Sequence, residues 1–257
     1  MQAHHYGPQF NLIDNVYLES LLTRLCAPET TQPEINSLVQ KLYLGLIETA
    51  VNSVFPHNTA ITKTRMTEVH PDAKLTARTF DRAAKAVSVN LARAGTFPSH
   101  TCYDFLHAVL PPENIRQDHI FAARLTDNAQ QVTGTHLGNY KIGGGVDDAY
   151  VIFPDPMGAT GGTLTSAVDY YENQIQGRAR QFIALHLIVT PEYLKRVLKH
   201  SKRIQVFALR VDRGMSDAEV QASPLGLYWE REKGLNEKQY IVPGAGGLGE
   251  LLNNSYV

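Results

Sequence analysis

The sequence has few of the features that mark several common classes of protein. Two cysteines, Cys26 and Cys102, cannot build a disulfide framework and do not show the spacing of a metal site. Apolar runs stay well short of the roughly 20 residues that span a bilayer. The first residues, MQAHHYGPQF, lack the basic-then-apolar pattern of a signal peptide. We therefore expect a cytoplasmic protein with reduced thiols and no membrane partner.

A strong charge of either sign is also missing. The chain has 24 basic and 25 acidic residues, and its formal net charge of −1 predicts no general affinity for nucleic acid. The 10 histidines do not show the spacing of a zinc site, so no metal-ligating residue is predicted. With 257 residues, 43% of them hydrophobic, the chain can bury a sizeable core and is expected to form a single domain.

The amino-terminal part is predicted to be mainly helical. Residues 1–10 are interpreted as a tail or arm. Apolar residues then recur at helical spacing over residues 15–26 and 33–54, so residues 1–55 are expected to form a helical extension. Residues 56–82 have an alternating, turn-rich character and are predicted to form short strands and loops.

From about residue 86 the pattern alternates between strands and helices. Such alternation is typical of parallel strands joined by helical crossovers, with both faces of the sheet covered. The expected fold is therefore α/β, a mostly parallel sheet with helices on both faces. The predicted strands are residues 86–91, 119–125, 149–153, 182–189 and 204–211, and the predicted helices are residues 99–110, 164–174 and 192–200.

One connection between two strands is unusually long. Residues 126–145 are polar, contain several glycines, and exceed the usual length of such a link. They include Tyr140 and Lys141 and end in three consecutive glycines, Gly143 to Gly145. We interpret the segment as a flap loop that closes over a reactive centre. The alternative is an exposed β-hairpin.

The most informative stretch is DAYVIFPDPMGATGGT, residues 148–163. A short apolar strand leads to Asp155, then to a turn of small residues and a helix-compatible segment. Gly161 and Gly162 let the backbone approach an anion, and the helix N-terminus directs unpaired N–H groups at it. The stretch therefore predicts a phosphate cradle at the carboxyl end of a strand, where ligands bind in such sheets. Thr160 and Thr163 add hydroxyl donors, and Asp155 is placed to bind hydroxyl groups beside the phosphate.

Residues 155–162, DPMGATGG, resemble the loop of type I phosphoribosyltransferases that binds 5-phosphoribosyl-1-pyrophosphate (PRPP). They are most similar to the Asp-Pro-Met-x-Ala-Thr-Gly-Gly loop of the uracil phosphoribosyltransferase family. The resemblance implies a type I phosphoribosyltransferase core, in which Asp155 is also a catalytic residue. The residues expected to hold the ribose phosphate are Asp155, Met157, Gly158, Ala159, Thr160, Gly161, Gly162 and Thr163.

Three basic residues are expected to face the pyrophosphate group of PRPP. Arg93 lies in NLARAG, residues 90–95, which resembles a Leu-Arg-Ala-Gly stretch of the family and follows a predicted strand. A guanidinium meets phosphate oxygens in pairs, so Arg93 is predicted to be catalytic as well. Arg124 matches the arginine of a family Tyr-Arg-Asp-Glu stretch whose acidic residues are absent here. Lys141 resembles a loop lysine of the family.

A second match lies near the carboxyl end. Residues 234–244, GLNEKQYIVPG, resemble the family's Gly-Leu-Asn-Glu-x-Gly-Tyr-Ile-x-Pro-Gly. In the family, backbone groups after the Tyr-Ile pair read the edge of uracil, and such donors and acceptors suit a small planar base. The resemblance implies that the base is bound by Tyr240, Ile241, Val242, Gly244, Gly246 and Gly247.

The base segment departs from the family in its acidic residues. The family continues Gly-Leu-Gly-Asp-Ala-Gly-Asp, whereas residues 244–250 read GAGGLGE. An aspartate at the base site is therefore Gly247 here, while Glu250 keeps the second charge on a longer arm. We expect base selection to rest on the backbone of residues 241–246. On that basis, Gly247→Asp is expected to raise turnover with uracil.

Residues 215–233 look inserted relative to the family. They contain Tyr228 and the only tryptophan, Trp229. These aromatic side chains either cover the pocket, form a subunit contact or simply pack.

Taken as a whole, the resemblance implies an enzyme that forms UMP and pyrophosphate from uracil and PRPP. Mg²⁺ is the expected counterion of the pyrophosphate group, and a homo-oligomer, a dimer or larger, is expected from the family. Three other interpretations stay open. They are a phosphoribosyltransferase for another base, a catalytically silent regulator that binds a nucleotide or PRPP, and a non-catalytic sugar-phosphate-binding module.

Overall fold

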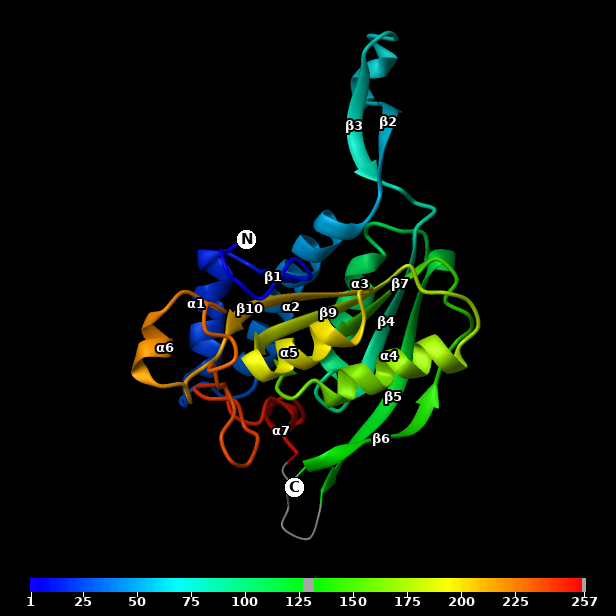
Figure 1. The fold of residues 1–257 in the computed structure, drawn as a ribbon. Helices are drawn as coiled ribbons and strands as arrows, with labels where there is room; N and C mark the ends of the chain where they lie inside the picture. Colours follow the sequence, from blue (N-terminus) through cyan, green and yellow to red (C-terminus); the bar gives the residue numbers. More distant parts are fainter. Residues whose placement is uncertain (127–131, 256–257) are drawn as a thin grey trace.

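A twisted, mostly parallel sheet forms the centre of the molecule (Figure 1). The computed structural model describes residues 1–126 and 132–255. The strands are β1 (Phe10–Leu12), β4 (Lys85–Ala92), β5 (Ile115–Thr126), β6 (Val132–Lys141), β7 (Ala149–Pro154), β8 (Met157–Gly158), β9 (Gln181–Val189) and β10 (Ile204–Val211). Their order is β1-β10-β9-β7-β4-β5-β6, and β8 pairs with β9 beside this path.

The pairing confirms the sheet that the sequence predicts. All described pairs in this sheet are parallel except β5 with β6. The strand that leads into the cradle, β7, lies in the interior between β9 and β4. All six of its residues are buried, as expected of a parallel strand covered on both faces.

Helices cover the two faces of the sheet. One face carries α1 (Val16–Cys26), α2 (Glu34–Val54) and α3 (Thr96–Leu106), and the other carries α4 (Gly162–Gln174) and α5 (Pro191–His200). Side chains along a strand alternate between the two cores: Ile152 packs with the first group of helices, and Phe153 packs with the second.

The helix that was predicted over 99–110 begins and ends earlier than expected, because α3 covers Thr96–Leu106. Residues 107–110 form turns before Pro111.

Residues 1–10 are not a free tail, so this interpretation was wrong. Phe10 begins β1, which extends the sheet beside β10. Tyr6 is buried, and its hydroxyl donates to a carboxylate oxygen of Glu232 at 2.6 Å. The buried Tyr6 ring and its hydrogen-bonded hydroxyl group therefore hold the amino-terminal segment against the body of the protein.

Residues 57–80 form an arm that projects from the body of the molecule (Figure 1). The arm consists of β2 (His57–Lys63) and β3 (Lys74–Phe80), which pair in antiparallel fashion, and a short 3₁₀ turn (Arg65–Glu68) between them. The sequence predicted short strands here, but it did not predict that they project far from the body of the molecule.

The segment interpreted as a flap loop contains a strand. Residues 132–141 form β6, which pairs antiparallel with β5, so the hairpin alternative describes this part of the chain. The base of the hairpin is fixed: the Tyr140 ring contacts Tyr170 of α4, and the backbone N–H of Gly143 donates to Asp118 at 2.9 Å. Closure of the hairpin over a reactive centre stays a prediction.

Residues 215–233 pack on the second core. They contain α6 (Ala218–Ala222) and Trp229, whose ring meets Tyr6 edge-on and whose N–H donates to the Pro191 carbonyl at 3.1 Å. Tyr228 is exposed. The last described helix, α7 (Leu248–Asn253), packs on the first core through Leu248.

Candidate active site

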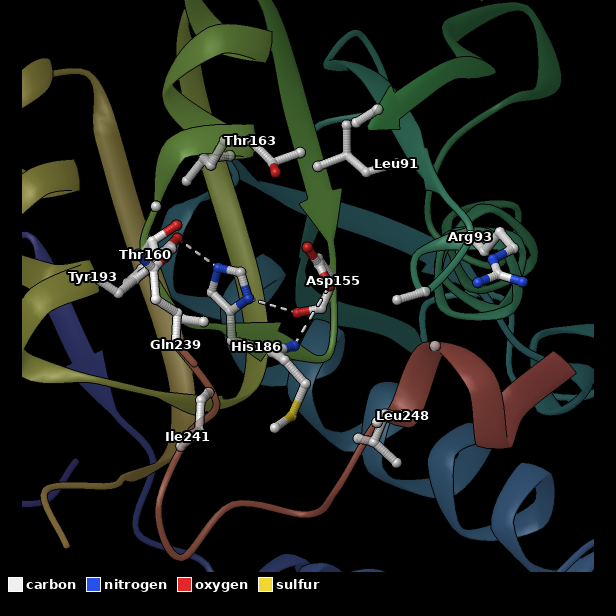
Figure 2. A pocket seen from close by; sticks show the side chains of 18 of the residues that line it. Leu91, Arg93, Asp155, Thr160, Thr163, His186, Tyr193, Gln239, Ile241 and Leu248 are labelled. Carbon is white, nitrogen blue, oxygen red and sulfur yellow. Dashed lines mark hydrogen bonds between the residues drawn. The ribbon is translucent and has the colours of Figure 1, made fainter. Parts of the chain in front are cut away.

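A pocket of about 360 Å³ lies at the carboxyl ends of β4, β7 and β9. Three stretches form its walls: residues 91–94 after β4, residues 155–164 after β7, and residues 239–250 near the carboxyl end. In Figure 2, Asp155 lies near the centre, between Thr160 on one side and Arg93 on the other, while Thr163 lies above and Ile241 and Leu248 lie below. The crevice at the strand ends is the position expected for ligands in an open α/β sheet.

The predicted cradle is the turn between β7 and α4. Gly161 caps the helix with φ of +77°, and a Cβ at this position would lie 2.8 Å from Cγ2 of Val197. Only glycine suits both the left-handed backbone and the close approach. The helix then begins at Gly162, and the N–H groups of its first turn have no partners within the helix. Together with the Thr160 and Thr163 hydroxyls, which line the pocket, these groups are hydrogen-bond donors of the kind that suit an anion.

The floor beneath the cradle comes from β9 and α5. His186 of β9 bonds through Nδ1 to the Asp155 carbonyl, and the Thr190 hydroxyl donates to the Ala159 carbonyl at 2.6 Å. The Tyr193 ring lies directly under Gly158, where a Cβ would come within 3.2 Å of it. These contacts hold two carbonyl groups of the turn toward the protein interior.

Two titratable side chains of this floor are buried, and burial disfavours their charged forms. His186 and Tyr193 are 2% and 1% exposed. Burial lowers the pKa of His186 to about 4, and the hydrogen bond to the Asp155 carbonyl opposes this only in part. Burial also holds the pKa of Tyr193 well above its ordinary value, with a contribution from the Asp155 carboxylate. Both side chains are therefore neutral near pH 7.

Arg93 follows β4 and lines the wall opposite the cradle. Its guanidinium donates to the Ser255 hydroxyl at 3.1 Å and lies 3.9 Å from a carboxylate oxygen of Glu250. The side chain is 44% exposed. It thus remains accessible to an anionic group in the pocket.

Of the other predicted basic residues, Lys141 lies at the end of β6 and is exposed, outside the described lining of the pocket. Arg124 pairs with Thr135 in the β5–β6 hairpin. The Arg124 side chain lies outside what the structure describes.

The predicted base segment forms the third wall. Tyr240, Ile241, Gly246 and Gly247 line the pocket. Val242 and Gly244 are not among the described lining residues. Both backbone groups of Val242 bond to the framework, its N–H to Gly234 and its carbonyl to Gly214.

An ion pair beneath this segment holds Gly244. The Arg210 guanidinium donates to both carboxylate oxygens of Asp212, at 2.6 and 2.8 Å, and also to the Gly244 carbonyl at 3.1 Å. The Gly244 N–H donates to Asp212 at 2.8 Å. Asp212 is almost fully buried. The pair thus fixes both backbone groups of one residue in the loop that leads to Gly246 and Gly247.

Several lining residues were not predicted from the sequence. Of the cradle residues, Gly158 and Gly162 shape the backbone without being among the described lining residues. His186 had a signal, because it is the one polar residue inside the apolar strand 182–189. Tyr193 and Gln239 had none that distinguishes them from ordinary helix and turn residues. The lining residues outside the prediction are Leu91, Ala92, Ala94, Ala122, Phe153, Leu164, His186, Tyr193, Gln239, Leu248, Gly249 and Glu250.

The parallel sheet and the cradle at the end of β7 define the fold class of type I phosphoribosyltransferases. The sequence model of the family described as uracil phosphoribosyltransferase matches residues 12–228. The chain therefore belongs to the uracil phosphoribosyltransferase family.

Similar proteins are distant in sequence. A uracil phosphoribosyltransferase of Aquifex aeolicus is 33% identical over 102 residues, which cover 40% of this chain and 38% of that protein. One of Mycoplasma capricolum subsp. capricolum is 29% identical over 123 residues, 48% of each protein. The matched segments thus span less than half the length of these relatives. The solved structure of the AQ2163 protein from Aquifex aeolicus covers 95% of this chain and 97% of its own, with a TM-score of 0.69 and 20% identity, a likeness in fold.

Proposed function

We propose that this chain transfers the phosphoribosyl group of PRPP to uracil, forming UMP and pyrophosphate. The observation that carries the proposal is the meeting of three separate stretches around one pocket. The cradle after β7, Arg93 after β4 and the segment from Tyr240 to Gly247 each suit a different part of that reaction. Membership of the uracil phosphoribosyltransferase family supports uracil as the base.

The cradle is suited to the ribose 5′-phosphate. The N–H groups at the start of α4 and the hydroxyls of Thr160 and Thr163 are donors directed at one anion. Asp155, at the carboxyl end of β7, offers carboxylate oxygens that accept hydrogen bonds, so it pairs with the ribose hydroxyl groups. These contacts hold the sugar while its C1′ atom reacts.

The transfer breaks the bond from C1′ to the pyrophosphate oxygen and forms a bond from C1′ to a ring nitrogen of the base. That nitrogen loses its proton to the departing pyrophosphate or to water. Negative charge develops on pyrophosphate as it leaves, and positive charge develops on the ribose. Arg93 stabilises the leaving group, because its guanidinium can meet two phosphate oxygens at once. The backbone around Ile241 and Gly246 orients the base toward C1′.

Mg²⁺ accompanies PRPP in this proposal. Magnesium prefers oxygen ligands and is commonly held by one or two carboxylates together with substrate phosphates. The described residues contain no cluster of three or more side chains that could hold a metal alone. The Asp155 carboxylate in the pocket fits a site in which one carboxylate holds the ion together with substrate phosphates. The ion would neutralise pyrophosphate charge that Arg93 meets only in part.

We further propose a homo-oligomer in a reducing cytoplasm. The projecting arm exposes apolar side chains, which mark contact surfaces when they gather on one element; they are Ile61, Met66, Val69 and Leu75. Both cysteines are free thiols. No described helix combines the length and apolar character needed to cross a bilayer. Light scattering with size-exclusion chromatography measures the oligomeric state.

Pyrophosphate release over a panel of bases tests the proposed activity. Turnover with uracil alone supports it. Turnover with another base alone would favour a different phosphoribosyltransferase, an alternative that the departure at Gly247 keeps open. PRPP binding without turnover on any base would indicate a silent regulator or a sugar-phosphate-binding module.

Calorimetry with PRPP and Mg²⁺ tests the cradle separately. Thr160→Arg places a long side chain in the pocket and is expected to abolish binding. Thr23→Arg, on the exposed surface of α1, is the matched control and should bind as the wild type does. Equal binding by all three proteins would remove the cradle from the proposed site.

A further inference from the structure

Gly247 and Glu250 share one space in the wall of the pocket. Both residues line it, one just before α7 and one in the first turn of that helix. A Cβ built on Gly247 would collide with the Oε2 atom of Glu250. The Glu250 carboxylate therefore lies where a side chain at position 247 would begin.

Backbone geometry in this turn supports that arrangement. The N–H of Glu250 donates to the Gly247 carbonyl at 3.0 Å, which places the two residues on one face of the turn. Gly249 packs against Ala94, where a Cβ would lie 3.5 Å from the Ala94 side chain. The turn is thus held against the loop that carries Arg93.

We infer that Glu250 supplies the acidic contact of the base subsite, and that glycine at position 247 leaves the space in which this carboxylate lies. The inference rests on the proposed function, which it makes more specific. An ionised carboxylate accepts hydrogen bonds and cannot donate them. The site therefore selects a planar base that presents a ring N–H or an exocyclic amino group toward Glu250, beside the backbone groups of residues 241–246.

The location of the carboxylate supports a base contact. Gly246, Gly247 and Leu248, which precede Glu250 in the chain, all line the pocket beside Ile241. The Glu250 side chain is 35% exposed, so it is open to the pocket. Its distance of 3.9 Å from Arg93 is long for a direct hydrogen bond, so most of its hydrogen-bonding capacity is available to a ligand.

The inference leads to the opposite of one expectation from the sequence. Gly247→Asp was expected to restore a family carboxylate and to raise turnover with uracil. In the structure the new side chain would meet the Glu250 carboxylate, so two like charges would compete for one position. The single substitution is therefore expected to lower turnover.

The rival role for Glu250 is to orient Arg93. The two roles have different kinetic signatures. A base contact changes kcat/KM for the base and the discrimination between bases, whereas an Arg93 tether changes the KM for PRPP.

Four variants separate these roles: Glu250→Gln, Gly247→Asp, the double variant Gly247→Asp with Glu250→Gly, and the control Glu113→Gln. Glu113 is exposed in a turn remote from the described lining of the pocket. Steady-state kinetics with uracil and PRPP, and calorimetry with UMP, are measured on each variant. Thermal melting confirms that each one is folded.

Glu250→Gln is expected to lower kcat/KM for uracil and the affinity for UMP by roughly ten- to a hundred-fold, the loss typical of a hydrogen bond to a charged group. The KM for PRPP should stay within about two-fold, because no cradle contact is altered. Gly247→Asp should also lose activity, and the double variant should recover part of it by returning one carboxylate to the vacated space. Glu113→Gln should match the wild type.

Two results would overturn the inference. One is a double variant that is no better than Gly247→Asp alone, and the other is a Glu250→Gln enzyme whose defect lies in the KM for PRPP. Wild-type turnover tests the proposed function, whereas the pattern among variants tests Glu250, so the two can fail separately. If the wild type turns over no base, UMP affinity still reports on Glu250, and equal affinity in wild type and Glu250→Gln would reject its role.

Discussion

The Tyr193 hydroxyl oxygen lies 2.5 Å from Nε2 of His186, and Nδ1 of the same ring lies 2.5 Å from the Asp155 carbonyl oxygen (Figure 2). The ring is neutral and carries a single N–H. Because a carbonyl oxygen can only accept, Nδ1 donates to Asp155 and Nε2 accepts from Tyr193. These two buried hydrogen bonds are therefore donated in one direction, from Tyr193 of α5 to His186 of β9 and from His186 to the carbonyl of Asp155, the residue that begins the cradle. We expect them to fix the backbone on which the Asp155 carboxylate is mounted.

Replacing His186 by leucine tests these two hydrogen bonds. The substitution leaves the Tyr193 hydroxyl and the Asp155 carbonyl without their partner in a buried site, which costs about 1–3 kcal/mol for each group. The free energy of unfolding should fall by about 2–5 kcal/mol in urea titrations. PRPP affinity should fall as well, because the cradle loses one of its fixed points.

The double variant His186→Leu with Tyr193→Phe serves as the control. It removes the stranded hydroxyl as well, and replacing both partners of a buried hydrogen bond is often close to neutral. Stability should recover in part, while PRPP affinity stays low. If PRPP affinity instead recovered with stability, His186 would have no positioning role beyond the fold.

The same histidine predicts a dependence of stability on pH. The pKa of His186 is about 4 in the folded protein, against 6.5 for an unperturbed histidine, because burial disfavours the charged ring. Between these values the unfolded chain binds a proton that the folded chain does not. The free energy of unfolding should therefore decrease as pH falls from about 6.5 to 4.

At roughly 1.4 kcal/mol for each pKa unit, the full contribution of this histidine is about 3 kcal/mol. Carboxylates titrate in the same range, so the quantity to measure is the difference between the wild type and His186→Leu. Urea titrations at several pH values should show a steeper decline for the wild type. Parallel curves for the two proteins would mean that His186 is not buried as a neutral ring.

Gly161→Ala should disable the cradle. The φ angle of +77° disfavours alanine by about 1–2 kcal/mol, and the added Cβ would lie 2.8 Å from Val197. Both effects push the turn away from the position that directs its N–H groups at the anion. Calorimetry should show a loss of PRPP binding together with a lower melting temperature.

Gly7→Ala is the matched control for the backbone effect. Gly7 has φ of +102°, and a Cβ there would meet no atom within 4 Å. This variant should lose only the stability that the positive φ costs, about 1–2 kcal/mol, and keep its PRPP affinity. Loss of binding in both variants would point to general destabilisation instead of a role of the turn.

The sequence could predict those parts of the site whose residues are consecutive within one short segment. The cradle is such a part, because its strand, glycine turn and helix start are consecutive and each follows from local preferences. The parallel pairing and the cover of helices on both faces follow from the same alternation, whereas the order of the strands across the sheet does not. The strand over 132–141 could have been favoured over a loop, since VTGTHLGNYK carries the β-branched and aromatic residues of a strand.

Relations between distant residues could not be predicted in this way. Tyr6 is buried because its hydroxyl meets Glu232, at the other end of the chain. The closeness of the Glu250 carboxylate to Gly247 depends on the backbone path into α7, which spacing alone does not give. His186 stood out as a polar residue in an apolar strand, and its bond to Asp155 appears only when β9 is placed beside β7.

Arg210→Lys should weaken base binding without affecting PRPP. Arginine holds Asp212 with two nitrogen atoms and reaches the Gly244 carbonyl with one of them, a geometry that a single ammonium group does not reproduce. Lysine keeps the charge beside the buried Asp212 and so avoids the larger cost of an unpaired carboxylate. Loss of one hydrogen bond to Gly244 lets the loop before Gly246 shift, and the expected rise in the KM for uracil is about ten-fold.

Arg203→Lys is the matched control for that substitution. Arg203 also bonds to a carboxylate and a carbonyl, those of Glu172 and Ala179, at a place outside the described lining of the pocket. Its variant should lose some stability and keep both KM values. Steady-state kinetics with each substrate varied in turn distinguish the two variants. A rise in the KM for PRPP as large as that for uracil, in Arg210→Lys alone, would mean that the Gly244 loop supports the whole pocket and not the base subsite.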